Sequence, residues 1–188
     1  MTEVMSSDQK EPQHFARSTW LIMSKPLAAT VMAYLTAVAI GAGVAGISPL
    51  AAIDKSANTG PSAFEIFVNN AAVLPWIWLG LVSLGLVSLA VICLNGALLG
   101  WVVGKSIVDG NSVDIVTGIL PHFVPEMGAF FLSAAITIAL AVRLPELFKS
   151  GRSRSKWPGY LRIWLVVQLL AVVLVAIGAI VERTVSYV

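Results

Sequence analysis

A histidine and a glutamate four residues apart, His122 and Glu126, are the side chains through which this chain is best equipped to do chemistry. They lie in the segment GILPHFVPEMGAFFLSAAITIALAV (118–142), which is otherwise apolar and long enough to cross a bilayer. An ionisable group at membrane depth is costly, so it is expected to have a function or a specific polar partner. Because residues four apart on a helix share a face, the two side chains are expected to act together.

Three roles are open for this pair. In a structural role, Glu126 accepts hydrogen bonds from its own helix start and from a neighbouring amide, Asn69, Asn70 or Asn95. In a proton or ion pathway, both side chains are relay groups. A metal or hydrolytic site is the third role, but the sequence has no HExxH motif, and His14 is predicted on the opposite side of the membrane. We expect the structural role, with no catalytic residue, no metal and no cofactor.

Three amides accompany the pair in apolar surroundings. Asn69 and Asn70 are adjacent in FEIFVNNAAVLP, and Asn95 lies in ICLNGALLG. Amides inside membrane helices commonly join neighbouring helices by hydrogen bonds. The sequence therefore predicts an intramembrane polar cluster of Asn69, Asn70, Asn95, His122 and Glu126.

Glycines indicate where helices approach closely. Gly41, Gly43 and Gly46 lie in GAGVAG, and Gly96 and Gly100 are four residues apart. Small residues allow two helix backbones to pack against each other in lipid. We expect both groups of glycines to be docking surfaces for other helices.

The composition determines the class of protein. Hydrophobic residues make up 57% of the chain and charged residues 12%, and the mean hydropathy is +0.86. Almost no charge occurs in four stretches, 27–47, 66–104, 115–142 and 163–181. Their apolar character is continuous rather than alternating, which indicates helices and not a barrel. The sequence predicts an all-α polytopic membrane protein without a soluble domain.

Basic residues predict the topology. Half of the Lys and Arg residues lie in the loop 143–162, so this loop and the N-terminus are expected in the cytoplasm. The stretch 66–104 must then begin and end on the same side of the membrane. A short tight or re-entrant hairpin that turns between Gly80 and Ser88 satisfies this requirement, and one long tilted helix is the alternative.

Five membrane helices are therefore expected, with the N-terminus in and the C-terminus out, at 27–47, 64–82, 86–104, 119–142 and 161–181. A partly amphipathic cytoplasmic segment, 1–26, precedes this single membrane domain, and a short tail, 182–188, follows it. In the fourth helix the regular turns are expected to start at Pro125, with Pro121 to Val124 unwound, because proline is disfavoured inside a helix and favoured at its start.

The order of these motifs resembles the stage II sporulation protein M (SpoIIM) family over about 64–144. The matching features are the Asn69-Asn70 pair, Asn95-Gly96 followed by Leu98, Leu99 and Gly100, the PHxxxE pattern of Pro121, His122 and Glu126, and a helix rich in small residues that ends in Arg143. The chain departs from the family pattern at Phe123, Pro125 and Gly128, where the family usually has glycine, an aromatic residue and proline.

The resemblance implies a membrane scaffold. The sporulation member is expected to hold peptidoglycan-degrading partners at the septum without being the hydrolase, and nothing in this chain is specific to sporulation. We expect a non-enzymatic subunit of the cell membrane whose partners are the lipid bilayer and other integral membrane proteins or copies of itself, and not nucleic acid. A small transporter or channel with a polar site around His122 and Glu126 is the alternative. A membrane-embedded hydrolase is the third hypothesis, against which the residue inventory argues.

Overall fold

The computed structural model describes residues 10–47, 60–110, 112–145 and 157–186, and these residues contain helices and turns but no strand. The main elements are α1 (Lys10–Ala45), α2 (Ala63–Ala71), α3 (Val73–Trp78), the 3₁₀ turn η1 (Leu79–Leu81), α4 (Leu86–Val108), α5 (Ser112–Ala141) and α7 (Trp157–Ser186). Five described segments are long and apolar enough to span a membrane: Trp20–Ala45, Ala63–Leu81, Leu86–Val108, His122–Ala141 and Trp157–Val185. The predicted all-α membrane protein with five spanning helices is confirmed.

Parts of three predicted segments lie outside the described residues. They are 1–9 of the N-terminal segment, 146–156 of the basic loop and 187–188 of the tail, and most of the first loop (48–59) is outside as well. The placement of the N-terminus in the cytoplasm therefore stays a prediction from the distribution of basic residues.

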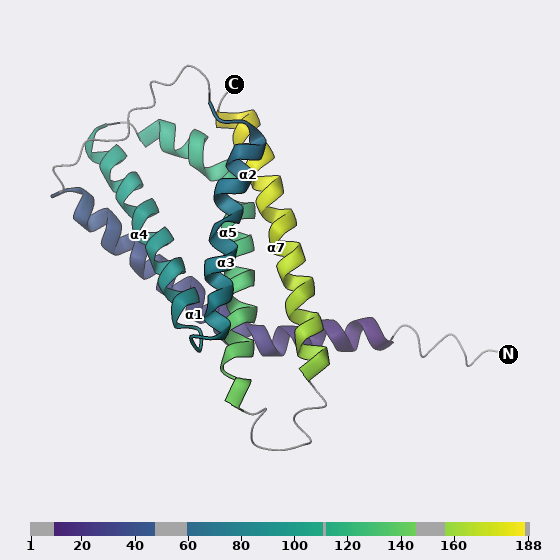
Figure 1. The fold of residues 1–188 in the computed structure, drawn as a ribbon. Coiled ribbons are helices and arrows are strands. Elements are labelled where there is room, and N and C mark those ends of the chain that lie inside the picture. Colours follow the sequence, from purple (N-terminus) through teal and green to yellow (C-terminus); the bar gives the residue numbers. More distant parts are fainter. Residues whose placement is uncertain (1–9, 48–59, 111, 146–156, 187–188) are drawn as a thin grey trace.

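The long apolar stretch in the middle of the chain is a tight hairpin. Its first limb is α2, α3 and η1, its second limb is α4, and the turn lies at the end of the bundle where α5 ends and α7 begins (Figure 1). Leu84 and Gly85 have φ angles of 54° and 91°, and the Gly85 N–H donates to the Gly80 carbonyl over 2.7 Å. The buried Ser88 hydroxyl donates to the Ile77 carbonyl over 2.5 Å and joins the two limbs.

The first limb begins at a capping box. The Ser62 hydroxyl accepts a hydrogen bond from the Glu65 N–H, and the Glu65 carboxylate accepts one from the Ser62 N–H over 2.7 Å. The backbone N–H groups of Ser62 and Glu65, which have no partner within the helix, are thereby both satisfied. The limb is interrupted at Ala72, between α2 and α3, because Pro75 has no N–H to bond the Ala71 carbonyl.

Helices α1 and α4 pack against each other through small residues. A Cβ added at any of four glycines would collide with atoms of the facing helix: Gly41, Gly96, Gly100 and Gly104. Gly43 and Gly46, in contrast, face away from α4 and meet no other helix within 4 Å. Of the five glycines expected to dock other helices, three therefore already pack against another helix of the same chain: Gly41, Gly96 and Gly100.

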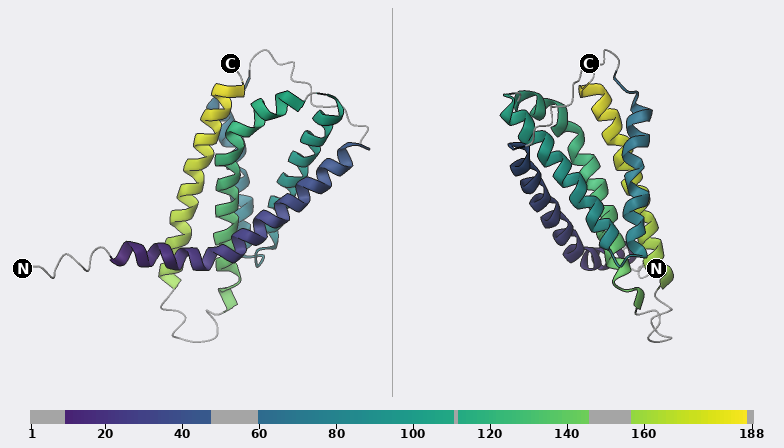
Figure 2. Two further views of the ribbon diagram at one scale, coloured as in Figure 1. Left: turned by 180° about the vertical axis from the view of Figure 1, so that it is seen from behind. Right: turned by 60° about the vertical axis from the view of Figure 1, so that its left-hand side comes forward.

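Helix α5 lies at the centre of the bundle, against α1, the hairpin and α7 (Figure 2). It has room there because alanines such as Ala129, Ala134 and Ala139 are fully buried, while Phe130 fills the core beside them. Within the apolar 18-residue stretch of each spanning helix, 56% is buried in α5, but only 22% is buried in α1 and in α4. The least lipid-exposed helix of the bundle is thus the one that carries His122 and Glu126.

The expected unwinding of Pro121 to Val124 is wrong, because α5 runs as one helix from Ser112 to Ala141. Figure 2 shows that the helix bends instead, with its first part at an angle to the remainder. The two prolines, Pro121 and Pro125, are four residues apart and so lie on one face. The lost hydrogen bonds fall on that side alone, which bends the helix without ending it.

A buried amide ties α7 to α3 and α5. Gln168 Oε1 accepts hydrogen bonds from Trp78 Nε1 over 2.8 Å and from Ser133 Oγ over 2.6 Å. Its Nε2 donates to Thr137 Oγ1 over 3.2 Å, and Trp164 Nε1 donates to the same hydroxyl over 3.2 Å. Five side chains thus satisfy one another where water is absent, as a bilayer requires. Sequence reasoning did not single out this network.

Helix α1 contains Pro26 and bends, so that its first part lies across the end of the bundle at which α5 ends (Figure 2). Met23 in this part is buried in a cluster with Ile136 of α5 and Ile163 of α7, whereas Trp20 and Leu21 are exposed. One side of the segment therefore packs on the bundle and the other is exposed, which is the arrangement of a helix lying in a membrane surface.

Replacement of Gly100 by alanine is expected to lower the free energy of unfolding by about 1–3 kcal/mol, because the new methyl group would overlap the α1 backbone at Val38. Thermal unfolding of the purified protein in detergent measures the change. Gly43→Ala is the matched control on the open face of α1, and alanine there should maintain or slightly raise stability. Wild-type stability of Gly100→Ala would contradict the close packing.

Candidate polar site in the membrane

The predicted partner of Glu126 is found on α2. Asn70 Nδ2 donates to Glu126 Oε1 over 2.6 Å, and both side chains are partly buried. A hydrogen bond of this length is short for an amide donor. Asn70 therefore holds one oxygen of Glu126 in place and links the hairpin to α5.

Asn69 lies beside this contact on the exposed side of α2. Its Nδ2 is 3.4 Å from Asn70 Oδ1, so the Asn70 amide has its oxygen toward Asn69 and its nitrogen toward Glu126. Asn95, the third predicted amide, donates to the Val91 carbonyl of its own helix over 2.9 Å. The structure thus brings Asn70 into contact with Glu126 and places Asn69 at the edge, whereas the hydrogen bond of Asn95 stays within α4.

An acid from the last helix completes the site. Glu182 lies on α7, which continues to Ser186 beyond the end at 181 expected from hydropathy. His122 Nε2 is 4.0 Å from Glu182 Oε2, and the two side chains are 15% and 20% exposed. One imidazole or carboxylate atom each of His122, Glu126 and Glu182 lies within 4.8 Å of the others. Two carboxylates and an imidazole from two helices therefore face one another.

A glycine on α7 leaves the space that Glu126 occupies. A Cβ added at the buried Gly178 would lie 2.5 Å from Glu126 Cγ and 3.0 Å from its Oε1. Gly178 is four residues before Glu182, on the same face of α7. The approach of α7 to the Glu126 side chain thus depends on the absence of a side chain at this position.

Glu182 is the member of the site that sequence reasoning missed. It stands immediately after the last apolar stretch, where an acid looks like an ordinary surface residue. One signal was available, since Gly178 and Glu182 are four apart just as His122 and Glu126 are. That spacing alone does not tell which helices are neighbours, so the convergence becomes visible only once α5 and α7 are packed together.

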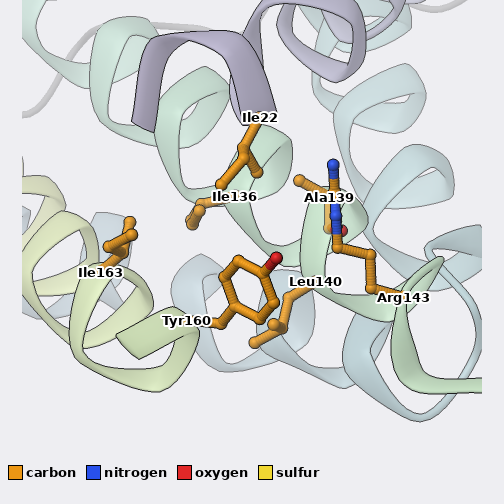
Figure 3. A pocket seen from close by; sticks show the side chains of 7 residues that line it. All are labelled: Ile22, Ile136, Ala139, Leu140, Arg143, Tyr160 and Ile163. Carbon is orange, nitrogen blue, oxygen red and sulfur yellow. The ribbon is translucent and has the colours of Figure 1, made fainter. Parts of the chain in front are cut away.

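The chemistry open to these groups is proton sharing, hydrogen bonding and cation binding, because carboxylates and neutral imidazole offer acceptor lone pairs. A separate recess lies at the other end of the bundle, lined by apolar side chains with the Arg143 and Tyr160 side chains among them (Figure 3). Its volume of about 10 Å³ leaves space for roughly one water, far below that of an organic-ligand pocket. The polar site on α5 and α7 is therefore the stronger candidate for function.

Comparison with known proteins gives one match. The family model described as "Stage II sporulation protein M" matches residues 21–187. No curated protein and no solved structure matches the chain significantly. The matched range includes all five membrane-spanning segments except the first residue of the first one, and every residue of the polar site.

Replacement of Asn70 by alanine is expected to lower stability by about 1–2 kcal/mol, because Glu126 loses a hydrogen-bond donor in an environment without water. Unfolding in detergent provides the measurement. Asn69→Ala removes an identical side chain one position away and should have a much smaller effect. A double-mutant cycle with Glu126→Ala isolates the contact, and a coupling energy near zero would refute it.

Proposed function

Because this chain belongs to the stage II sporulation protein M family, we propose that it is a non-enzymatic scaffold of the cell membrane that assembles with other integral membrane proteins. Family membership and five spanning helices support the general class, a multi-pass membrane protein. The exposed surface of α1 supports the docking of a partner helix, and the rest of the proposal is based on that surface.

The observation that carries the proposal is a second face of small residues on α1. Thr36, Ala39 and Gly43 are separated by three and four residues, so they follow one side of the helix, and Gly46 lies in the turn that follows its end at Ala45. All four residues are exposed. Gly41 and its neighbours on the opposite side pack on α4. Helix α1 therefore has one small-residue face engaged within the chain and a similar one that no described element of the chain covers.

Membrane helices associate largely by close packing, because lipid tails are as apolar as leucine and there is no hydrophobic driving force. Small residues matter since they let backbones approach. Within this chain, close packing of small residues likewise joins α1 to the glycines of α4. The exposed face is accordingly suited to a spanning helix of a partner that itself has small residues at the point of crossing.

A second surface feature supports a partner. Asn69 is exposed on α2 within the spanning segment Ala63–Leu81. An amide at membrane depth gains from hydrogen bonding to another helix rather than facing lipid. Asn69 contacts Asn70 at 3.4 Å, and its exposure leaves it accessible to a partner as well.

We expect Gly43→Leu to abolish recovery of the partner in a mild-detergent pull-down of the tagged protein from its native membrane, with mass spectrometry of what co-purifies. Gly43 is exposed and a Cβ added there meets no atom within 4 Å, so expression and unfolding temperature of Gly43→Leu should stay near those of the wild type. Gly159→Leu is the matched control, because that glycine also has open space around it but lies on α7.

The possible outcomes separate the hypotheses. A stoichiometric membrane partner lost in Gly43→Leu and retained in Gly159→Leu supports the scaffold. Recovery of the wild type alone would overturn it and favour the small transporter. In that case Glu126→Gln should abolish flux while the protein stays folded, whereas a scaffold should keep its partner after the same substitution.

A further inference from the structure

The groups around Glu126 have the arrangement of metal ligands. His122 and Glu126 are four apart on α5, which directs both side chains to one side of the helix. Glu182 approaches from α7, with its Oε2 4.0 Å from His122 Nε2. All three donor atoms lie within 4.8 Å of one another. Small side-chain rotations that move each donor atom by about an ångström would place all three at about 2.0–2.2 Å from a shared ion.

The donor types decide which ion would fit. Magnesium and calcium prefer oxygen ligands throughout, whereas an imidazole nitrogen together with carboxylates suits zinc and other divalent transition metals. Three protein ligands leave a fourth position open for water, as in zinc sites that are not purely structural. Two carboxylates would also neutralise the charge of the ion where the surrounding helices are apolar.

The surroundings of the three groups are those of a supported site. Asn70 donates to Glu126 Oε1 over 2.6 Å, which orients the carboxylate and leaves its second oxygen for an ion. Outer contacts of this kind fix the direction of metal ligands. Gly178 gives the Glu126 side chain its space against α7, and the His122 and Glu182 side chains are mostly shielded from the outside.

We propose that His122, Glu126 and Glu182 bind one divalent transition-metal ion, with Zn²⁺ as the best fit. The argument against a metal site from sequence was a shortage of ligands near His122, and Glu182 supplies the missing one. The site would connect α5 and α7 near the C-terminal end of α7, the side predicted to face outward. The proposal does not depend on the scaffold function, since it concerns metal binding by the isolated chain.

The test is titration of the purified, metal-free protein in detergent with ZnCl₂ by calorimetry, and with Mg²⁺ for comparison. We expect one Zn²⁺ per chain and weaker or undetectable Mg²⁺ binding. Co²⁺ should bind at the same position and give visible absorption bands characteristic of nitrogen and oxygen ligands in a site of low coordination number. Affinity should decrease as the pH falls, because protons compete for the imidazole and the carboxylates.

Matched variants identify the site. His122→Ala and Glu182→Gln should each lower Zn²⁺ affinity by at least about tenfold. Glu65→Gln, which removes an exposed acid on α2, should leave affinity unchanged. Gly178→Ala should lower affinity with every ligand still present, because the new methyl group displaces Glu126, whereas Gly128→Ala on α5 meets no atoms within 4 Å and should be silent.

Three results would overturn the proposal. The first is a folded wild type that takes up no Zn²⁺ at micromolar concentration. The second is a set of folded site variants that all bind as the wild type does, which would mean an adventitious ion only. The third is a loss of affinity in Glu65→Gln as large as that in Glu182→Gln. If His122→Ala fails to fold, Glu182→Gln and Gly178→Ala carry the same comparison, since both retain the histidine.

Discussion

The structure depends on the exclusion of water from the hydrocarbon core of a bilayer. A polar group at membrane depth has no solvent to bond, so each one must be satisfied by another part of the bundle. Among the cross-helix contacts that meet this requirement are Asn70 with Glu126 and Gln168 with its hydroxyl and indole partners. They fasten the hairpin and α7 to α5, and the fully buried alanines of α5 let the neighbouring helices come close enough for these bonds to form. The glycine contact of α1 with α4 adds the remaining helix by close packing alone.

Much of the fold could be predicted because lipid imposes simple rules. Continuous apolar stretches predicted the helices. The hairpin was predicted because the stretch 66–104 has to begin and end on the same side of the membrane, and its turn with Gly85 lies between Gly80 and Ser88 as expected. Amides and an acid inside apolar runs drew attention to Asn70 and Glu126, which the structure brings into hydrogen-bond contact. What could not be predicted is which helices are neighbours. Asn95 looked as good a partner as Asn70, yet it bonds the Val91 carbonyl, and Glu182 looked like the start of a tail. Adjacency of α5 and α7 is a property of the packed bundle rather than of any segment.

Two further differences have local causes. Proline rules predicted a break at Pro121 to Val124, but two prolines on one face of a helix that is packed at the centre of the bundle bend it and do not end it. Glycine patterns correctly indicated close helix contacts, but they cannot tell a contact inside the chain from one with another protein. The structure makes that distinction for α1, because Gly41 meets α4 while Gly43 meets nothing. Helix periodicity would have separated these two faces in the sequence, yet it would not have shown which of them is occupied.

Two of the polar contacts of α5 lie at different depths in the bundle. Glu126 and Ser133 are seven residues apart, which is about 10 Å along a helix, and α7 engages the helix at both levels through Gly178 and Gln168. A single contact would leave the crossing angle of these two antiparallel helices unspecified. Contacts almost two helical turns apart fix that angle as well as the relative rotation of the helices. The surfaces that α5 and α7 present to a neighbouring protein therefore follow from contacts on their inner sides.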